Sequence, residues 1–192
     1  FISSKNSVCL KAPWSSSGRG VIFSDQNSRE KILQWASGFL KTQGGVMGEF
    51  HYNKRIDFAS EWLVAEDEIT FRGLSLFQSD AKGKYLGNRL MRQADIERLL
   101  KAESKWKDEI LICQRDFISK YISPHYRGPL GFDMLVTDKG DVNPCVEINL
   151  RQTMGHVAIE VEKQMNDSNK TEIAYCLKKY FPDGVFSVNN FI

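Results

Sequence analysis

The chain has 192 residues, a formal net charge of +2, and 42% hydrophobic and 26% charged residues. This length can bury a sizeable core, as one domain or as two small lobes. The small net charge argues against nucleic acid and membrane-surface partners, and no apolar run approaches the length of a membrane span. The four cysteines have no metal-ligand spacing, so we expect free thiols in a reducing, cytoplasmic compartment.

The first informative stretch is a strand, a small-residue loop and a second strand. A strand is predicted at 7–10 and is followed by Lys11, and another is predicted at 21–23. The loop between them ends in Ser15, Ser16, Ser17, Gly18, Arg19 and Gly20. Small residues let a backbone approach a phosphate, serine hydroxyls can donate to it, and lysine supplies a positive charge. The loop is not a Walker motif, because no GK[ST] precedes a helix. Composition alone favours a mobile linker.

The middle of the chain predicts a helix followed by antiparallel sheet. Asn27-Ser28-Arg29-Glu30 has capping-box spacing and begins a helix with an apolar stripe, which Gly44-Gly45 ends. Short strands are expected at 46–50, 55–65 and 68–77. In the second of these, alternation places Asp57 and Glu61 opposite the apolar residues, on what we expect to be the solvent face.

The second half is predicted to contain more helix. The polar, glycine-punctuated segment 78–92 is interpreted as a loop with room for one short strand. Helical spacing of apolar residues predicts helices at 94–101 and 105–122. Two closing helices are expected at 157–165 and 171–180, followed by a turn at 182–184.

The stretch from Gly128 to His156 carries the clearest chemical signal. It predicts strands at 130–137 and 142–149, joined by the turn 138–140. Glycine at the third loop position suits a left-handed residue that closes a hairpin.

This loop length predicts the register of the hairpin. Asp133 would pair with Cys145 and be a diagonal neighbour of Glu147, on one face with Asn149, at about 7–8 Å between backbones. Two carboxylates this close repel unless a cation lies between them, and oxygen ligands suit Mg²⁺. Arg151, two residues after Asn149, would supply a positive charge to an anionic partner. The alternative is an exposed hairpin with ordinary polar alternation, and a two-residue loop would move Asp133 to the other face.

Three features in one order resemble the nucleotide-binding core of the ATP-grasp superfamily, which includes biotin carboxylase and the D-alanine–D-alanine ligases. These are Lys11 before the Ser/Gly loop, Glu49 at the end of a short strand, and the hairpin G-F-D…E-I-N-L-R from Gly131 to Arg151. The resemblance implies an α+β fold, in which two lobes with antiparallel sheets hold ATP between them. Residues 1–48 would form the small lobe and 49–192 the large lobe.

The resemblance also implies roles for individual residues. Lys11 would bind the α- or β-phosphate, and residues 15–20 would close over the triphosphate. Glu49 would bind the adenine amino group, and Asp57 would hold the ribose hydroxyls. The remaining implied positions are Phe50, His51 and Tyr52 along the adenine, Asp133, Glu147 and Asn149 as ligands of Mg²⁺ or Mn²⁺, Arg151 near the reacting group, and Arg72, Tyr85, Asn88 and Arg89 as candidates for the acceptor pocket.

The implied activity is an ATP- and Mg²⁺-dependent ligase that activates a small-molecule carboxylate as an acyl phosphate. An amine or thiol then attacks it, most often forming a carbon–nitrogen bond. A small-molecule kinase and a non-catalytic nucleotide-binding module are the alternatives. The family normally has a further domain before the strand carrying Lys11, and this chain starts at Phe1, so we expect a missing N-terminal domain. An arginine that D-alanine–D-alanine ligases carry two residues before the first metal aspartate would fall at Gly131.

Overall fold

The computed structural model describes residues 7–15, 20–80, 83–100, 106–164, 172–176 and 185–187. These residues form two compact units. The first comprises the described residues up to Asn53 together with the segment Ser79–Tyr85. The second comprises Lys54–Gln78 and the described residues from Leu86 onward.

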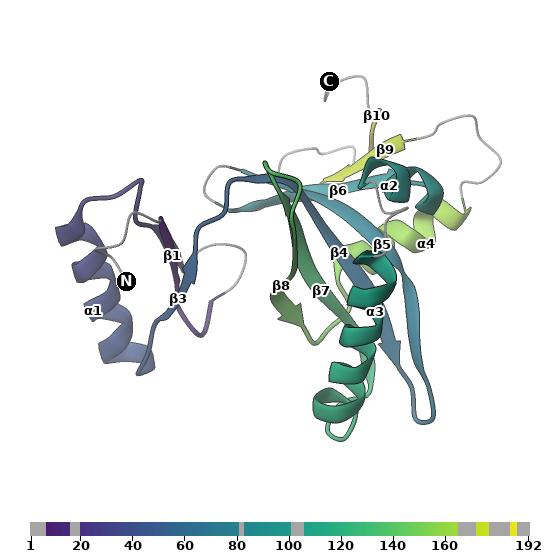
Figure 1. The fold of residues 1–192 in the computed structure, drawn as a ribbon, viewed down its shortest axis with the longest axis horizontal. Coiled ribbons are helices and arrows are strands. Elements are labelled where there is room, and N and C mark those ends of the chain that lie inside the picture. The colour runs from purple at the N-terminus through teal and green to yellow at the C-terminus, as the bar shows by residue number, and fades with distance from the viewer. Residues whose placement is uncertain are drawn as a thin grey trace. The chain divides into compact units, whose positions relative to one another are not determined.

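The first unit is a small antiparallel sheet with one helix (Figure 1). Strands β1 (Val8–Lys11), β2 (Val21–Phe23) and β3 (Met47–Phe50) are ordered β2-β1-β3. Lys11 is the last residue of β1, as predicted, and pairs with Val21 on one side and Met47 on the other. Glu49 therefore lies on the strand next to the one that carries Lys11.

Helix α1 (Arg29–Gln43) begins and ends where the sequence predicts. The Ser28 side chain accepts a hydrogen bond from the Lys31 backbone N–H at 3.3 Å. Gly44 adopts φ 75°, which glycine tolerates without strain, and its N–H donates to the Leu40 carbonyl at 3.1 Å. Of the predicted apolar stripe, Ile32 is buried, whereas Leu33 and Leu40 are each about half exposed.

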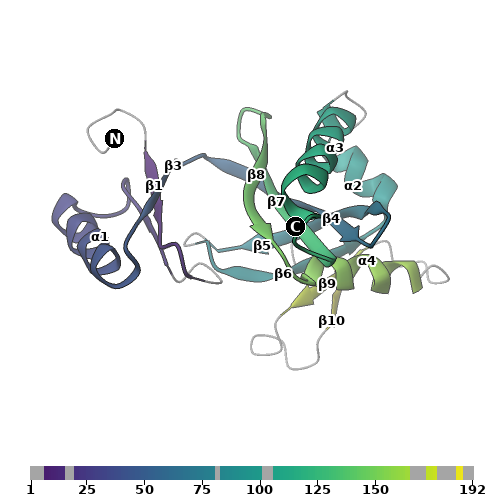
Figure 2. The same ribbon diagram turned by 90° about the horizontal axis from the view of Figure 1, so that it is seen from below.

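The second unit is built on a long antiparallel sheet (Figures 1 and 2). Its order is β10-β9-β6-β5-β4-β7-β8. The strands are β4 (Lys54–Val64), β5 (Ile69–Ser79), β6 (Tyr85–Met91), β7 (Gly128–Thr137), β8 (Val142–Asn149), β9 (Glu172–Cys176) and β10 (Val185–Ser187). The hairpin expected from the sequence is β7–β8, at the edge of the sheet.

One expectation for the second half was wrong. Residues 172–176 form β9, which pairs with β6, and not a closing helix. The sequence there is Glu-Ile-Ala-Tyr-Cys. The open edge of β6 offers this segment backbone hydrogen bonds, and these stabilise a strand more than the local helical pattern stabilises a helix. The segment 78–92, expected as a loop with room for one short strand, contains β6 from Tyr85 to Met91, and β5 extends into it as far as Ser79. The turn predicted at 182–184 lies outside the described residues.

Helices cover both faces of this sheet, as Figure 2 shows. Helices α2 (Gln93–Leu99) and α3 (Trp106–Phe117) lie on one face, and α3 continues into the π-helical turn η1 (Ile118–Ile122). Helix α4 (Met154–Gln164) lies on the other face. The prediction of a solvent face on β4 was therefore wrong for Glu61, which is 1% exposed.

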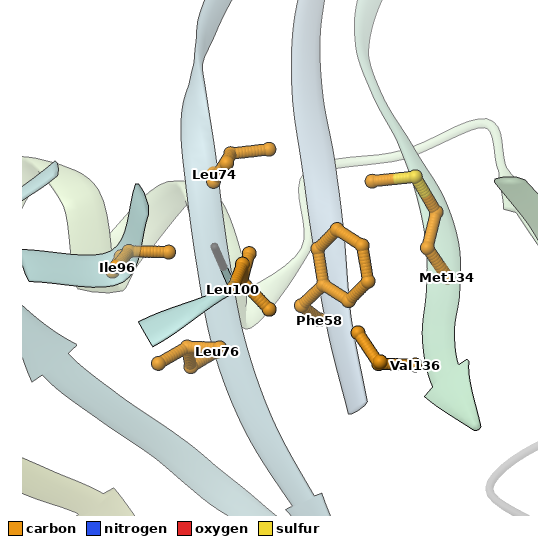
Figure 3. Close-up of a cluster of buried hydrophobic side chains, with 7 residues drawn as sticks. All are labelled: Phe58, Leu74, Leu76, Ile96, Leu100, Met134 and Val136. Carbon is orange, nitrogen blue, oxygen red and sulfur yellow. The ribbon is translucent and has the colours of Figure 1, made fainter. Parts of the chain in front are cut away.

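The main core lies between the sheet and the helices α2 and α3. Figure 3 shows its seven buried members, Phe58, Leu74, Leu76, Ile96, Leu100, Met134 and Val136. A second cluster surrounds Trp62, with Ile118 from η1 and Leu130 and Phe132 from β7. Both clusters use alternate residues of β4 and β7, so the intervening residues of these strands face α4. No helix among the described residues is long and apolar enough to cross a membrane.

Candidate functional site

The β7–β8 hairpin places two carboxylates side by side on neighbouring strands. Asp133 is directly opposite Glu147, not opposite Cys145 as the loop length predicts. The predicted loop itself is present, since the Thr137 N–H donates to the Asp141 carbonyl at 2.8 Å. The register changes further along, where a bulge adds two residues to β8 between its pairings with Leu135 and Asp133.

A chain of polar contacts connects this pair to the predicted arginine. Asn149 is opposite Gly131, so its side chain shares a face with Asp133. The Asn149 amide nitrogen donates to the Asp133 carboxylate at 3.1 Å, and Arg151 donates to the Asn149 amide oxygen at 2.9 Å. The structure therefore brings together the three predicted metal ligands, Asp133, Glu147 and Asn149, and the predicted catalytic Arg151.

The electrostatics of this cluster favour a bound cation. Burial, then the charges of Glu147 and Glu61, raise the pKa of Asp133 to about 7, while Asn149 and Arg151 act in the opposite direction. A divalent ion between Asp133 and Glu147 would relieve this repulsion. No three His, Cys, Asp or Glu side chains among the described residues form a metal-binding group. The set fits Mg²⁺, which binds one or two carboxylates and takes its other ligands from water and phosphate.

The pKa of Asp133 predicts how the stability of the ligand-free chain depends on pH. Because this pKa is raised from 3.8 to about 7, the contribution of Asp133 to the free energy of unfolding is fully present below pH 3.8 and is lost as pH rises to about 7. The resulting fall in the free energy of unfolding should reach at most about 4 kcal/mol, and Asp133→Asn should lack it while keeping any fall due to other groups. Urea unfolding of both chains between pH 4 and 8 measures it, and parallel curves would contradict the assignment.

Sequence reasoning missed a buried acid that lies beside this cluster. Glu61 on β4 accepts a hydrogen bond from the Ser75 hydroxyl at 2.9 Å. Its second carboxylate oxygen makes no well-aligned hydrogen bond but lies 3.0 Å from Nδ1 of His156, which makes an ion pair when that histidine is protonated. Burial lowers the pKa of His156, but the adjacent Glu61 carboxylate outweighs it and the pKa lies above its ordinary value. His156 Nε2 lies 3.1 Å from the Trp62 carbonyl.

Two glycines make room for the Glu61 carboxylate. A Cβ at Gly131 would lie 2.6 Å from Glu61 Oε2, and a Cβ at Gly155 would overlap the same carboxylate. These glycines, in G-F-D and G-H, were the sequence signal that could have indicated a buried group. The same closeness of the Glu61 carboxylate leaves no room at Gly131 for the arginine that D-alanine–D-alanine ligases carry there.

The predicted phosphate and adenine residues lie in the first unit. Lys11 Nζ is 2.7 Å from the Glu49 carboxylate, so these two predicted nucleotide contacts are paired with each other. Gly20 is required by a close approach, because a Cβ there would lie 2.5 Å from that of Ser15. The other four residues of the Ser/Gly loop, 16–19, lie outside the described residues.

The segment after Glu49 exposes its aromatic side chains. Phe50 is 48% and Tyr52 43% exposed. His51 is stacked on Phe23, with ring centroids 4.4 Å apart, and its Nδ1 lies 3.2 Å from Asp25. The predicted ribose ligand, Asp57, belongs to the second unit, where it accepts a hydrogen bond from Lys54 at 2.6 Å.

The four acceptor-pocket candidates do not form one cluster. Arg72 on β5 pairs with Glu160 of α4 at 3.1 Å. Asn88 is buried and its amide donates to the Leu76 carbonyl at 3.0 Å. Arg89 follows it on β6 and so points to the opposite face. Tyr85 is half-buried at the start of the same strand.

The arrangement of strands and helices is that of the ATP-grasp fold, which confirms the fold expected from the sequence. Biotin carboxylase from Campylobacter jejuni matches with a TM-score of 0.59 and 15% identity, over 84% of this chain and 36% of that protein. N5-carboxyaminoimidazole synthetase from Staphylococcus aureus, complexed with ADP, matches with a TM-score of 0.57 and 16% identity, over 81% of this chain and 37% of that protein.

A curated protein is also similar in sequence. The chain is 26% identical, over 154 residues, to the [butirosin acyl-carrier protein]–L-glutamate ligase of Niallia circulans. This match covers 80% of the chain and 35% of that protein. No family model matches the chain. The chain thus spans about a third of the length of the proteins that it resembles.

Proposed function

We propose that this chain is the nucleotide- and metal-binding part of an ATP-dependent ligase that activates a carboxylate as an acyl phosphate. One observation carries the proposal. On an ATP-grasp fold, Asp133 and Glu147 are directly opposed, and Asn149 connects Asp133 to Arg151. An exposed structural hairpin gains nothing from two opposed carboxylates, which repel each other.

In this proposal Asp133, Glu147 and Asn149 hold Mg²⁺, which neutralises phosphate oxygens during phosphoryl transfer. To coordinate the ion, the Asn149 oxygen would leave or share the Arg151 hydrogen bond. Arg151 then supplies its charge to the reacting carboxylate or phosphoryl group. Lys11 holds the α- or β-phosphate, and Glu49 is released to the adenine amino group.

The reaction has two steps. A carboxylate oxygen of the substrate attacks the γ-phosphorus, the bond to the bridging oxygen breaks, and ADP leaves. The nitrogen or sulfur of the acceptor then attacks the acyl carbon, and phosphate leaves while the acceptor loses its proton. Water would hydrolyse the acyl phosphate, so residues 15–20 are proposed to cover the triphosphate. In this scheme residues 1–48 contribute the phosphate loop, and 49–192 the adenine segment and the metal hairpin.

Calorimetry of ATP binding with and without Mg²⁺ is the first test. We expect binding that Mg²⁺ strengthens, and equal affinities in both titrations would contradict the metal site. Product analysis then separates the alternatives. A ligase releases ADP and phosphate only with both substrates, a kinase releases ADP without phosphate, and a binding module releases neither. The similarity to the butirosin ligase makes an acyl-carrier protein and L-glutamate the first pair to try.

Replacing Lys11 with methionine should weaken ATP binding by about 10–100-fold, which corresponds to one charge-assisted contact to phosphate. Binding of adenosine should change much less, because it has no phosphate. Calorimetry with both ligands measures the difference. Lys41→Met, at an exposed position in the last turn of α1, is the matched control and should bind ATP normally. An unchanged ATP affinity for Lys11→Met would remove Lys11 from the site.

A further inference from the structure

The register of β7 and β8 is not explained by the hairpin itself. The three-residue loop alone would place Asp133 opposite Cys145, as the pairing of Leu135 with Asn143 near the loop shows. A slip of two residues keeps every side chain on its own face, so the apolar pattern cannot distinguish the two registers. The observed register also places Asp133 opposite Glu147, which costs repulsion. Another interaction must therefore select it.

The bulge that changes the register is contacted by a polar side chain from a helix distant in sequence. The side-chain amide nitrogen of Gln114, on α3, donates to the carbonyl of Pro144 at 3.0 Å. Pro144 lies in the bulge and has no N–H for the sheet ladder, so its carbonyl is free to turn toward α3. Gln114 is 5% exposed and is the only buried polar residue that α3 contributes in the described part of the chain.

The other atoms of the Gln114 amide are also occupied. Its oxygen accepts hydrogen bonds from the Ser60 hydroxyl at 2.7 Å and from the Trp62 indole N–H at 3.3 Å. Its nitrogen also contacts the Met134 sulfur at 3.5 Å. A buried amide that loses a partner pays the full desolvation cost, so this network stabilises only the backbone arrangement that satisfies it.

We propose that Gln114 is a positioning residue: by holding the Pro144 carbonyl it maintains the bulge, and the bulge keeps Asp133 opposite Glu147. Gln114 lies on the face of the sheet opposite the two carboxylates and touches neither. Its importance for metal binding rests on the proposed function, whereas its control of the register does not. The test therefore reads the register and the metal site separately.

Disulfide formation reports the register directly. A thiol placed at 133 by Asp133→Cys can reach Cys145 only in the slipped register. With Asp133→Cys, Glu147→Cys and Cys145→Ser combined, the two thiols can pair only in the observed register. Facing side chains in a sheet are close enough for a disulfide, at about 4–5 Å between Cβ atoms. Peptide mapping by mass spectrometry after mild oxidation identifies the bond and excludes pairing with Cys9, Cys113 or Cys176.

With Gln114 present, we expect the 133–147 disulfide and no 133–145 disulfide. With Gln114→Met, which keeps the volume but not the hydrogen bonds, we expect the 133–145 disulfide to appear. Ser60→Ala, which removes a Gln114 contact remote from the bulge, should behave as the parent. An unchanged pattern in Gln114→Met overturns the proposal, and so does the same slip in Ser60→Ala. If Gln114→Met does not fold, Gln114→Glu loses the donor to Pro144 and serves instead.

The metal site is then measured in chains that retain Asp133 and Glu147. Gln114→Met should bind Mn²⁺ in the presence of ADP at least about tenfold more weakly, the loss typical when a supporting partner of a metal site is removed. Electron paramagnetic resonance of free Mn²⁺ gives the affinity, and Ser60→Ala is again the control. A register slip without any Mn²⁺ binding by the parent chain would retain the role of Gln114 in the hairpin and refute the proposed metal site.

Discussion

Glu147→Gln is expected to abolish the Mg²⁺ dependence of ATP binding and to stabilise the ligand-free chain. Glu147 is exposed and faces Asp133 directly, so its charge serves a cation but opposes folding in the absence of one. Mg²⁺-dependent affinity should fall by more than about 100-fold, because even outer-shell partners of a metal contribute 10–100-fold. The free energy of unfolding should rise by about 0.5–1 kcal/mol, the usual cost of like charges opposite each other in a sheet.

Calorimetry and urea unfolding of the same preparation measure both effects. The opposite signs distinguish a functional carboxylate from a structural one, since loss of a structural group would weaken both binding and stability. Glu66→Gln, at the exposed turn between β4 and β5, is the matched control and should change neither quantity measurably. Retained Mg²⁺ dependence in Glu147→Gln would contradict the metal site, whatever its stability.

Glu61→Gln is expected to destabilise the chain by about 3–5 kcal/mol, the range seen when one partner of a buried ion pair is removed. Glu61 is 1% exposed, and its loss leaves the buried His156 without its counter-charge. The pKa of His156 in the folded chain lies above its ordinary value of 6.5, so the pair stabilises the fold fully below that pH. As pH rises through the folded pKa this contribution is lost, so the effect of Glu61→Gln should be larger at pH 6 than at pH 8.

Urea unfolding at the two pH values tests this prediction. Ser75→Ala removes only the hydroxyl that donates to Glu61, and should cost about 1 kcal/mol at either pH. The double variant Glu61→Gln with His156→Gln should be more stable than Glu61→Gln at pH 6, because no unpaired cation remains buried. Equal losses at pH 6 and pH 8 would mean that His156 is not charged in the folded chain.

Glu61 also matters for the candidate site, because its charge contributes to the raised pKa of Asp133. Glu61, Asp133 and Glu147 share one face of the sheet, and His156 balances only the first of them among the described contacts. Two acids therefore remain for a cation, while the buried one is neutralised by the protein. This division is consistent with a structural role for Glu61 and with the proposed binding role of the pair on the hairpin.

Local sequence determined much of the framework. Ser28 and Gly44 mark the two ends of α1. The Ser28 side chain accepts a hydrogen bond from a free backbone N–H of the first turn, and the left-handed backbone of Gly44 ends the last turn, so neither end depends on the rest of the chain. The strands at 130–137 and 142–149 follow from alternation and from the turn at 138–140. The position of Lys11 at the end of a strand follows from the short apolar segment before it and the small-residue loop after it. That Asp133, Glu147 and Asn149 lie on one face could likewise be predicted, because residues two apart in a strand share a face and a slip of two residues keeps it.

The tertiary structure decided what alternation cannot. Periodicity assigns residues to the two faces of a strand but does not say what covers each face. Glu61 was therefore expected in solvent, whereas in the structure α4 covers it. The segment 172–176 became a strand because β6 offers an edge, although its local pattern is compatible with a helix. The exact pairing of Asp133 with Glu147 depends on the bulge at Pro144, and a two-residue slip preserves every face. Only contacts between segments distant in sequence, such as the one from Gln114, distinguish those registers.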